Sequence, residues 1–97
     1  MQETILLSSK VRINEDIVSR NLQGEMVLLN LKTNLYCGLD PVGTKIWHLL
    51  NEQVNKHKSL KDILNELIKE YDVSEAQCTE DLLNFIRMLK EKDLIEI

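Results

Sequence analysis

The sequence predicts an α+β domain of the winged helix-turn-helix type, in which an N-terminal three-stranded antiparallel β-sheet is followed by three α-helices. Up to about residue 39, hydrophobic residues alternate with the period of strands. From about residue 41 they recur at the spacing of helices. The period changes at Asp40-Pro41. The carboxylate of Asp40 can accept hydrogen bonds from the free N–H groups of a first helical turn, and Pro41 loses nothing there by lacking an N–H.

A chain of 97 residues has room for one modest hydrophobic core, so residues 1–97 are predicted to form a single domain. No apolar run approaches the roughly 18 residues that a membrane span needs, and the N-terminus lacks the basic region of a signal peptide. We therefore expect a cytoplasmic protein that does not associate with membranes.

The first third of the chain is typical of strands. Residues 10–22 show partial alternation, which predicts one or two short strands. Residues 25–31 carry apolar side chains at both odd and even positions, and therefore on both faces of a strand. This pattern predicts a central strand whose second face is partly covered. A short hairpin loop at 32–34 ends in Asn34, the residue there that best tolerates positive φ. Strands joined this tightly pair antiparallel in chain order, so the strand at 35–39 lies at an edge of the sheet.

Helical patterns fill the remainder. A helix is expected from about 41 to 54, a second after the capping sequence 59–62, and a third from 74–77 to about 91. The tail at 93–97 could add a short strand. Each of the last two helices has one apolar face. These faces consist of Leu60, Ile63, Leu64, Leu67, Ile68 and Tyr71 on one helix, and of Cys78, Leu82, Phe85, Ile86 and Leu89 on the other.

Composition and motifs argue against several functions. The net charge of −4 disfavours nucleic acid as a partner, because nucleic-acid binders present a basic face. There is no Ser-His-Asp order, no glycine-rich phosphate loop and no evident carboxylate pair in a cleft. We therefore expect neither an enzyme nor a cofactor.

Cysteine, histidine and tryptophan offer little chemistry. Cys37 and Cys78 occupy apolar-facing positions and are interpreted as buried free thiols, not as a disulfide. In compact zinc modules the ligands occur in pairs that are only a few residues apart in the sequence. Cys37, His48, His57 and Cys78 do not have this spacing, so no metal site is expected. Trp47 is interpreted as a core or groove-edge residue, not as a stacking platform.

The residues taken together resemble the PqqD-like family, small domains that recognise the leader of a ribosomally made precursor peptide during its modification. The similarity runs from about Val11 to the C-terminus, and it is stronger to the stand-alone members of lasso-peptide pathways than to those of quinone-cofactor synthesis. One departure is Asp93, where many relatives carry glycine, and it leaves the end of the last helix open. The pattern consists of Val27-Leu28-Leu29-Asn30-Leu31, Tyr36-x-Gly38-Leu39-Asp40-x-x-Gly43-x-x-Ile46-Trp47 and Asp81-Leu82-x-x-Phe85-Ile86-x-x-Leu89-x-x-x-Asp93-Leu94-Ile95.

This resemblance implies a non-catalytic protein that binds a leader peptide as an added strand on the edge at 35–39, beside the third helix, and presents the precursor to a leader peptidase and a macrocyclising enzyme. Strand addition supplies main-chain hydrogen bonds, so specificity must come from side-chain pockets. Gly38 either lets a peptide backbone approach or marks a bulge. The expected peptide-binding residues are Leu35, Tyr36, Cys37, Gly38 and Leu39 on the strand and Leu82, Phe85, Ile86 and Leu89 on the helix.

Two other readings stay open at this level. A winged-helix transcription regulator would use the third helix on DNA, but the exposed acids there make a poor surface for phosphates. A dimerisation module is the other, because an unpaired edge strand can pair with a second copy of itself.

Overall fold

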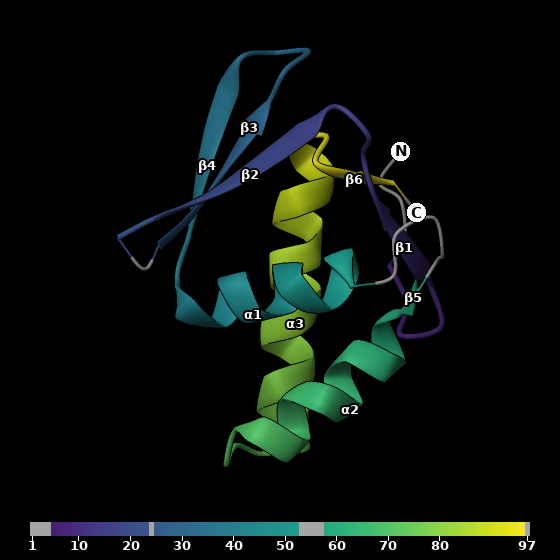
Figure 1. The fold of residues 1–97 in the computed structure, drawn as a ribbon. Coiled ribbons are helices and arrows are strands. Elements are labelled where there is room, and N and C mark those ends of the chain that lie inside the picture. Colours follow the sequence, from purple (N-terminus) through teal and green to yellow (C-terminus); the bar gives the residue numbers. More distant parts are fainter. Residues whose placement is uncertain (1–4, 24, 53–57, 97) are drawn as a thin grey trace.

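The computed structural model describes residues 5–23, 25–52 and 58–96. Figure 1 shows a sheet of long strands beside the C-terminal half of the last helix, with the other two helices crossing that helix lower down. The described elements are β1 (Lys10–Ile13), β2 (Ile17–Leu22), β3 (Glu25–Asn30), β4 (Leu35–Leu39), α1 (Pro41–Asn51), β5 (Lys58–Ser59), α2 (Leu60–Glu70), α3 (Glu75–Glu91) and β6 (Ile95–Glu96). The predicted α+β class is confirmed.

The long strands form an antiparallel sheet in the order β2-β3-β4, so the predicted edge position of β4 is confirmed. The strand expected at 25–31 ends one residue early, at Asn30. Buried Asn30 organises the following loop, because its Oδ1 accepts from the backbone N–H groups of Lys32 (2.9 Å) and Thr33 (3.3 Å). Asn34 has a φ of 62°, as its place at the end of the loop predicted.

Residues 10–22 divide between two sheets. β2 opens the sheet just described, whereas β1 pairs antiparallel with β5 on one side and β6 on the other. The expected C-terminal strand is therefore confirmed as β6, and its pairing with β1 is reinforced by an ion pair between Arg12 and Glu96. β5 has only two residues and was not predicted, because so short a segment carries no periodicity.

Each helix begins at a side-chain cap. Asp40 Oδ1 accepts from Gly43 N (2.6 Å) at the start of α1, with Pro41 in the first turn as predicted. Ser59 Oγ accepts from the N–H of Asp62, and Ser74 Oγ from that of Gln77. These contacts satisfy backbone donors that have no partner inside a helix. α1 ends at Asn51, before the expected residue 54, and residues 53–54 lie outside the described part of the chain.

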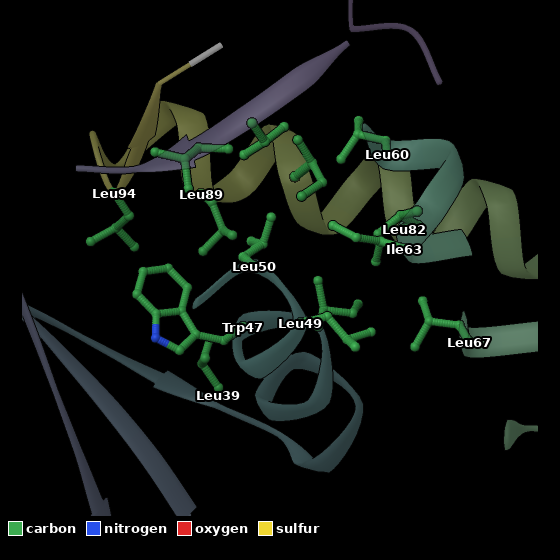
Figure 2. Close-up of a cluster of buried hydrophobic side chains, with 14 of the residues drawn as sticks. Leu39, Trp47, Leu49, Leu50, Leu60, Ile63, Leu67, Leu82, Leu89 and Leu94 are labelled. Carbon is green, nitrogen blue, oxygen red and sulfur yellow. The ribbon is translucent and has the colours of Figure 1, made fainter. Parts of the chain in front are cut away.

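The core lies between the three helices, and α1 also packs against β3 and β4 of the long sheet. Trp47 is 1% exposed and belongs to the same buried cluster as Leu39 and Leu94, so its interpretation as a core residue is confirmed (Figure 2). Cys37 and Cys78 are buried free thiols, also as predicted. On β3, Met26, Leu28 and Asn30 are buried, whereas Val27 and Leu29 on the outer face are half-buried.

Candidate functional site

β4 presents an open strand edge. It pairs with β3 on one side, in continuous register from Leu35 opposite Asn30 to Leu39 opposite Met26, and no described strand pairs with its other side. Alternate residues of an edge strand direct their N–H and C=O groups away from the sheet. The edge can therefore accept an extended peptide through main-chain hydrogen bonds.

α3 lies alongside β4 and runs in the opposite direction. Cys37 Sγ is 4.0 Å from Met88 Sδ, which places the middle of β4 against the second half of the helix. One helical turn toward the N-terminus, Phe85 packs on Gly43 of α1. One turn toward the C-terminus, Lys92 lines a small recess together with Leu35 and Tyr36 of β4. We call the edge of β4 together with Phe85, Met88 and Lys92 the β4–α3 surface.

The expected binding residues of β4 fall into two groups. Leu35 (65% exposed) and Tyr36 (74%) are open to solvent, and Gly38 is exposed as well. Cys37 and Leu39 are buried and point toward the core. Leu35, Cys37 and Leu39 share the inner face of the sheet, and Tyr36 and Gly38 share the outer face.

The expected residues of α3 divide in the same way. Leu82, Ile86 and Leu89 are fully buried and belong to the core beneath the β4–α3 surface. Phe85 alone of the four is half-buried, at the boundary between the core and the surface. As the chain folds here, a bound peptide could touch Phe85 directly, and the other three would support it from below.

Gly38 is paired opposite Val27 without interruption of the register, so the bulge interpretation is wrong. A Cβ at Gly38 would meet nothing within 4 Å. The glycine therefore leaves the outer face of β4 flat at that point.

Sequence reasoning did not select Met88, Lys92 and Asp81 for the site. With Phe85 they form a second stripe on α3 at helical spacing, next to the buried stripe. The signal was present, because 81, 85, 88 and 92 recur every three or four residues. Its mixture of charged and apolar residues resembled an ordinary solvent-exposed face.

A larger hollow lies beyond the Leu39 end of β4, where Asp40 begins α1. Its volume is about 400 Å³, and it is enclosed by the start of α1, the end of α2 and the first half of α3. Val42 (43% exposed) and Val73 (48%) stand at its rim, and Phe85 is common to it and to the β4–α3 surface. We call this cavity the α1–α3 hollow.

The thiols of the site are held in their neutral form. Burial raises the pKa of Cys37, and the nearby charge of Lys92 lowers it by a smaller amount. Burial also raises the pKa of Cys78, and the carboxylate of Asp81 acts in the same direction. Neither thiol is placed as an activated nucleophile.

Among residues 5–23, 25–52 and 58–96, no three His, Cys, Asp or Glu side chains are grouped so that they could hold a metal ion. His48 is exposed on α1, and His57 lies outside the described residues. None of the helices in this part of the chain is both long enough and apolar enough to span a bilayer.

The fold and this surface define a class of small α+β domain that leaves a strand edge open beside a helix. The chain belongs to the family described as "Coenzyme PQQ synthesis protein D (PqqD)", which matches residues 25–95. The suspected family is thereby confirmed. A comparison with the curated proteins found no match.

Solved structures give a closer comparison. The chain is 39% identical to the protein in "TbiB1 in Complex with the TbiA(beta) Leader Peptide", with a TM-score of 0.79 over 88% of this chain and 94% of that one. It is 23% identical to the protein in "Lasso peptide synthetase B1 complexed with the leader peptide", with a TM-score of 0.76 over 92% of this chain and the whole of that one. The second comparison shows a shared fold.

Proposed function

We propose that this protein binds the leader segment of a ribosomally made precursor peptide, that of a lasso peptide, by adding the leader as a strand to the open edge of β4. The observation that carries the proposal is this edge, unpaired within the described residues and flanked by the half-buried Phe85 and Met88 of α3. The 39% identical protein, TbiB1, was solved in complex with a leader peptide, which supports the same role here.

In this arrangement the main chain of β4 supplies affinity for the peptide, and the side chains around it supply specificity. Main-chain hydrogen bonds to β4 hold an extended peptide of any sequence, so discrimination falls to side chains that border the strand. We assign that role to Leu35, Tyr36, Phe85, Met88 and Lys92, which are open or half-buried around the β4–α3 surface. The buried Cys37, Leu39, Leu82, Ile86 and Leu89 hold these groups in place.

The protein performs no chemistry of its own in this proposal. Its two thiols are buried, and burial raises the pKa of both. It holds the precursor by its leader, so that a leader peptidase and a macrocyclising enzyme can act on the rest of the peptide. The anchored segment and the reacting segment are then different parts of one precursor.

Amide hydrogen exchange tests the docking mode. Suitable probes are the TbiA(beta) leader peptide and peptides selected on the full chain from a random display library. Because strand addition covers backbone N–H groups, we expect slower exchange at 35–39 when either probe binds. Exchange at 17–22, on the opposite edge of the sheet, serves as the internal control and is expected to stay unchanged.

Slower exchange confined to 17–22, or none in the sheet with any bound peptide, would reject strand addition to β4. If residues 35–39 are protected without peptide, and more so at higher protein concentration, the edge pairs with a second copy and the dimerisation reading is favoured instead. The transcription-regulator reading has no support from the comparisons. The acids exposed on α3, including Glu80 and Asp81, also oppose contact with phosphates.

A further inference from the structure

The α1–α3 hollow continues the line of the proposed peptide strand. β4 ends at Leu39, and the next residue, Asp40, already lines the hollow. A strand advances about 3.3 Å per residue, so a peptide paired with β4 would come to the hollow within about three residues beyond Leu39. Phe85 separates the two regions and borders both.

The shape and lining of the hollow suit an apolar side chain. Its volume of about 400 Å³ is in the range of pockets that enclose small ligands, about 300–1,000 Å³. The walls are mostly hydrocarbon, from Val42 and Ile46 on α1, Leu67 on α2 and Phe85 on α3. Its apolar rim residues Val42 and Val73 are exposed, so the hollow is open to solvent.

The charged side chains that line the hollow are of one sign. Asp40 and Asp81 are the charged residues among the described residues that line it. Both carboxylates are held in position, Asp40 by the N–H of Gly43 (2.6 Å) and Asp81 by the side-chain amide of Gln77 (2.9 Å). Arg87 donates to Asn84 at the rim (3.0 Å) without lining the hollow. A carboxylate fixed beside an apolar wall favours a cationic partner with a hydrocarbon stem.

We propose that the α1–α3 hollow binds an apolar side chain of the leader just outside the segment paired with β4, and that Asp81, together with Asp40, selects leaders with lysine or arginine beside that side chain. This inference rests on the proposed function and adds a specificity determinant to it. In the antiparallel pairing that strands favour, this part of the leader lies N-terminal to the paired segment.

The test begins with peptide selection. Random 20-residue peptides are displayed and selected in parallel on the wild-type chain, on Asp81→Asn, and on the control Glu80→Gln, which removes a neighbouring exposed charge that does not line the hollow. We expect wild type and Glu80→Gln to enrich lysine or arginine next to an apolar residue at one end of the selected motif. Asp81→Asn is expected to lose that enrichment and to bind the wild-type peptides about tenfold more weakly, as for a lost charge-assisted contact.

Two further measurements locate the contact. Asp81→Lys is expected to prefer the selected peptide after its cation is changed to glutamate, which restores the pair with reversed charge. A benzophenone placed at the selected apolar position is expected to crosslink to Val42 or Val73. Thermal melts of each variant establish that the domain is folded.

The outcomes separate this inference from the proposed function. If selected peptides slow exchange at 35–39 but show no cation preference, or if Asp81→Asn behaves like Glu80→Gln, the hollow is not the specificity site and strand addition still stands. Crosslinks at Tyr36 in place of the hollow would overturn the inference as well. If no selected peptide slows exchange at 35–39, the proposed function fails, and this inference fails with it.

Discussion

The ring of Phe85 lies directly against Gly43. A Cβ placed on Gly43 would come within 2.8 Å of Phe85 Cε1 and 3.2 Å of Cζ, closer than side-chain atoms normally approach. The glycine on α1 therefore sets the position of the one aromatic ring that borders both the β4–α3 surface and the α1–α3 hollow. A small residue in the first turn of one helix thus shapes the surface formed by another.

The effect of Gly43→Ala on the free energy of unfolding should have opposite signs with and without the Phe85 ring. In the wild-type background the new methyl group displaces the ring, and we expect a loss of about 1 kcal/mol in the free energy of unfolding. In a Phe85→Ala background only the contact of the new Cβ with Asp40 Oδ1 (3.1 Å) remains. There the same change should stabilise the domain, by less than the roughly 1 kcal/mol by which alanine favours helix over glycine. Urea denaturation of the four proteins measures the coupling. An equal gain in both backgrounds would mean that the ring moves aside without cost.

The sequence predicted the elements around the site better than it predicted which side chains face it. Asp40-Pro41 located the start of α1, and the alternation of 35–39 located a strand, because both depend on local backbone chemistry. The edge position of that strand followed from the short loops that join consecutive strands. α3, however, carries two adjacent stripes at helical spacing. The more apolar stripe, which includes Leu82 and Ile86, is the core. The mixed stripe borders β4 at Met88 and Lys92, and it borders the α1–α3 hollow at Asp81 and Phe85.

The small β5-β1-β6 sheet could not be predicted from local sequence patterns. β1 pairs with β5 and β6, segments that are about 50 and 80 residues away in the chain. β5 has two residues and β6 has two, too few to show a period of their own. Such pairings are fixed by how the helices pack, which a local pattern does not contain. Asn30 is similar: its burial and its contact with the Asp93 carbonyl depend on the folded chain.

Asp93 holds a backbone conformation that glycine would adopt more easily. Its φ is 56°, and α3 ends there with the N–H of Leu94 bonded to Leu89 O (2.9 Å) and that of Asp93 to Lys90 O (3.1 Å), the pattern of a Schellman motif. A carboxylate at a helix C-terminus is also unfavourable to the helix dipole. We therefore expect Asp93→Gly to raise the free energy of unfolding by about 0.5–1 kcal/mol, measured by urea denaturation.

A control separates the two causes at this position. Asp93→Asn removes the charge but keeps the Cβ, so it should recover only the part due to the dipole. The carbonyl of residue 93, which accepts from Asn14 Nδ2 (3.1 Å), is retained in both variants. If Asp93→Asn stabilises as much as Asp93→Gly, the backbone conformation is not the cause.

The buried thiols should make stability fall at alkaline pH. Burial raises the pKa of both Cys37 and Cys78, so above about pH 8.5 the unfolded chain loses thiol protons that the folded chain keeps. The contribution is fully present below the pKa of the unfolded thiols and is lost as pH rises through the folded values. We expect a smaller loss of the free energy of unfolding between pH 8 and pH 10 in the double variant Cys37→Ala, Cys78→Ala than in wild type. An equal or steeper loss in that variant would show that the thiols do not contribute.

Phe85 and Leu89 form a matched pair for testing the binding surface. They lie four residues apart on α3, but Leu89 is fully buried and Phe85 only half-buried. If Phe85 anchors an apolar residue of the leader, Phe85→Ala should weaken binding by about 2 kcal/mol or more, roughly thirtyfold, with a modest loss of stability because part of the ring is already in solvent. Leu89→Ala should instead cost about 2–5 kcal/mol of folding free energy and leave the affinity of each folded molecule close to that of wild type. Calorimetric titration with a display-selected peptide that slows exchange at 35–39, alongside a thermal melt of each variant, measures both quantities. A large melting loss with unchanged affinity for Phe85→Ala would place that ring in the core and remove it from the proposed site.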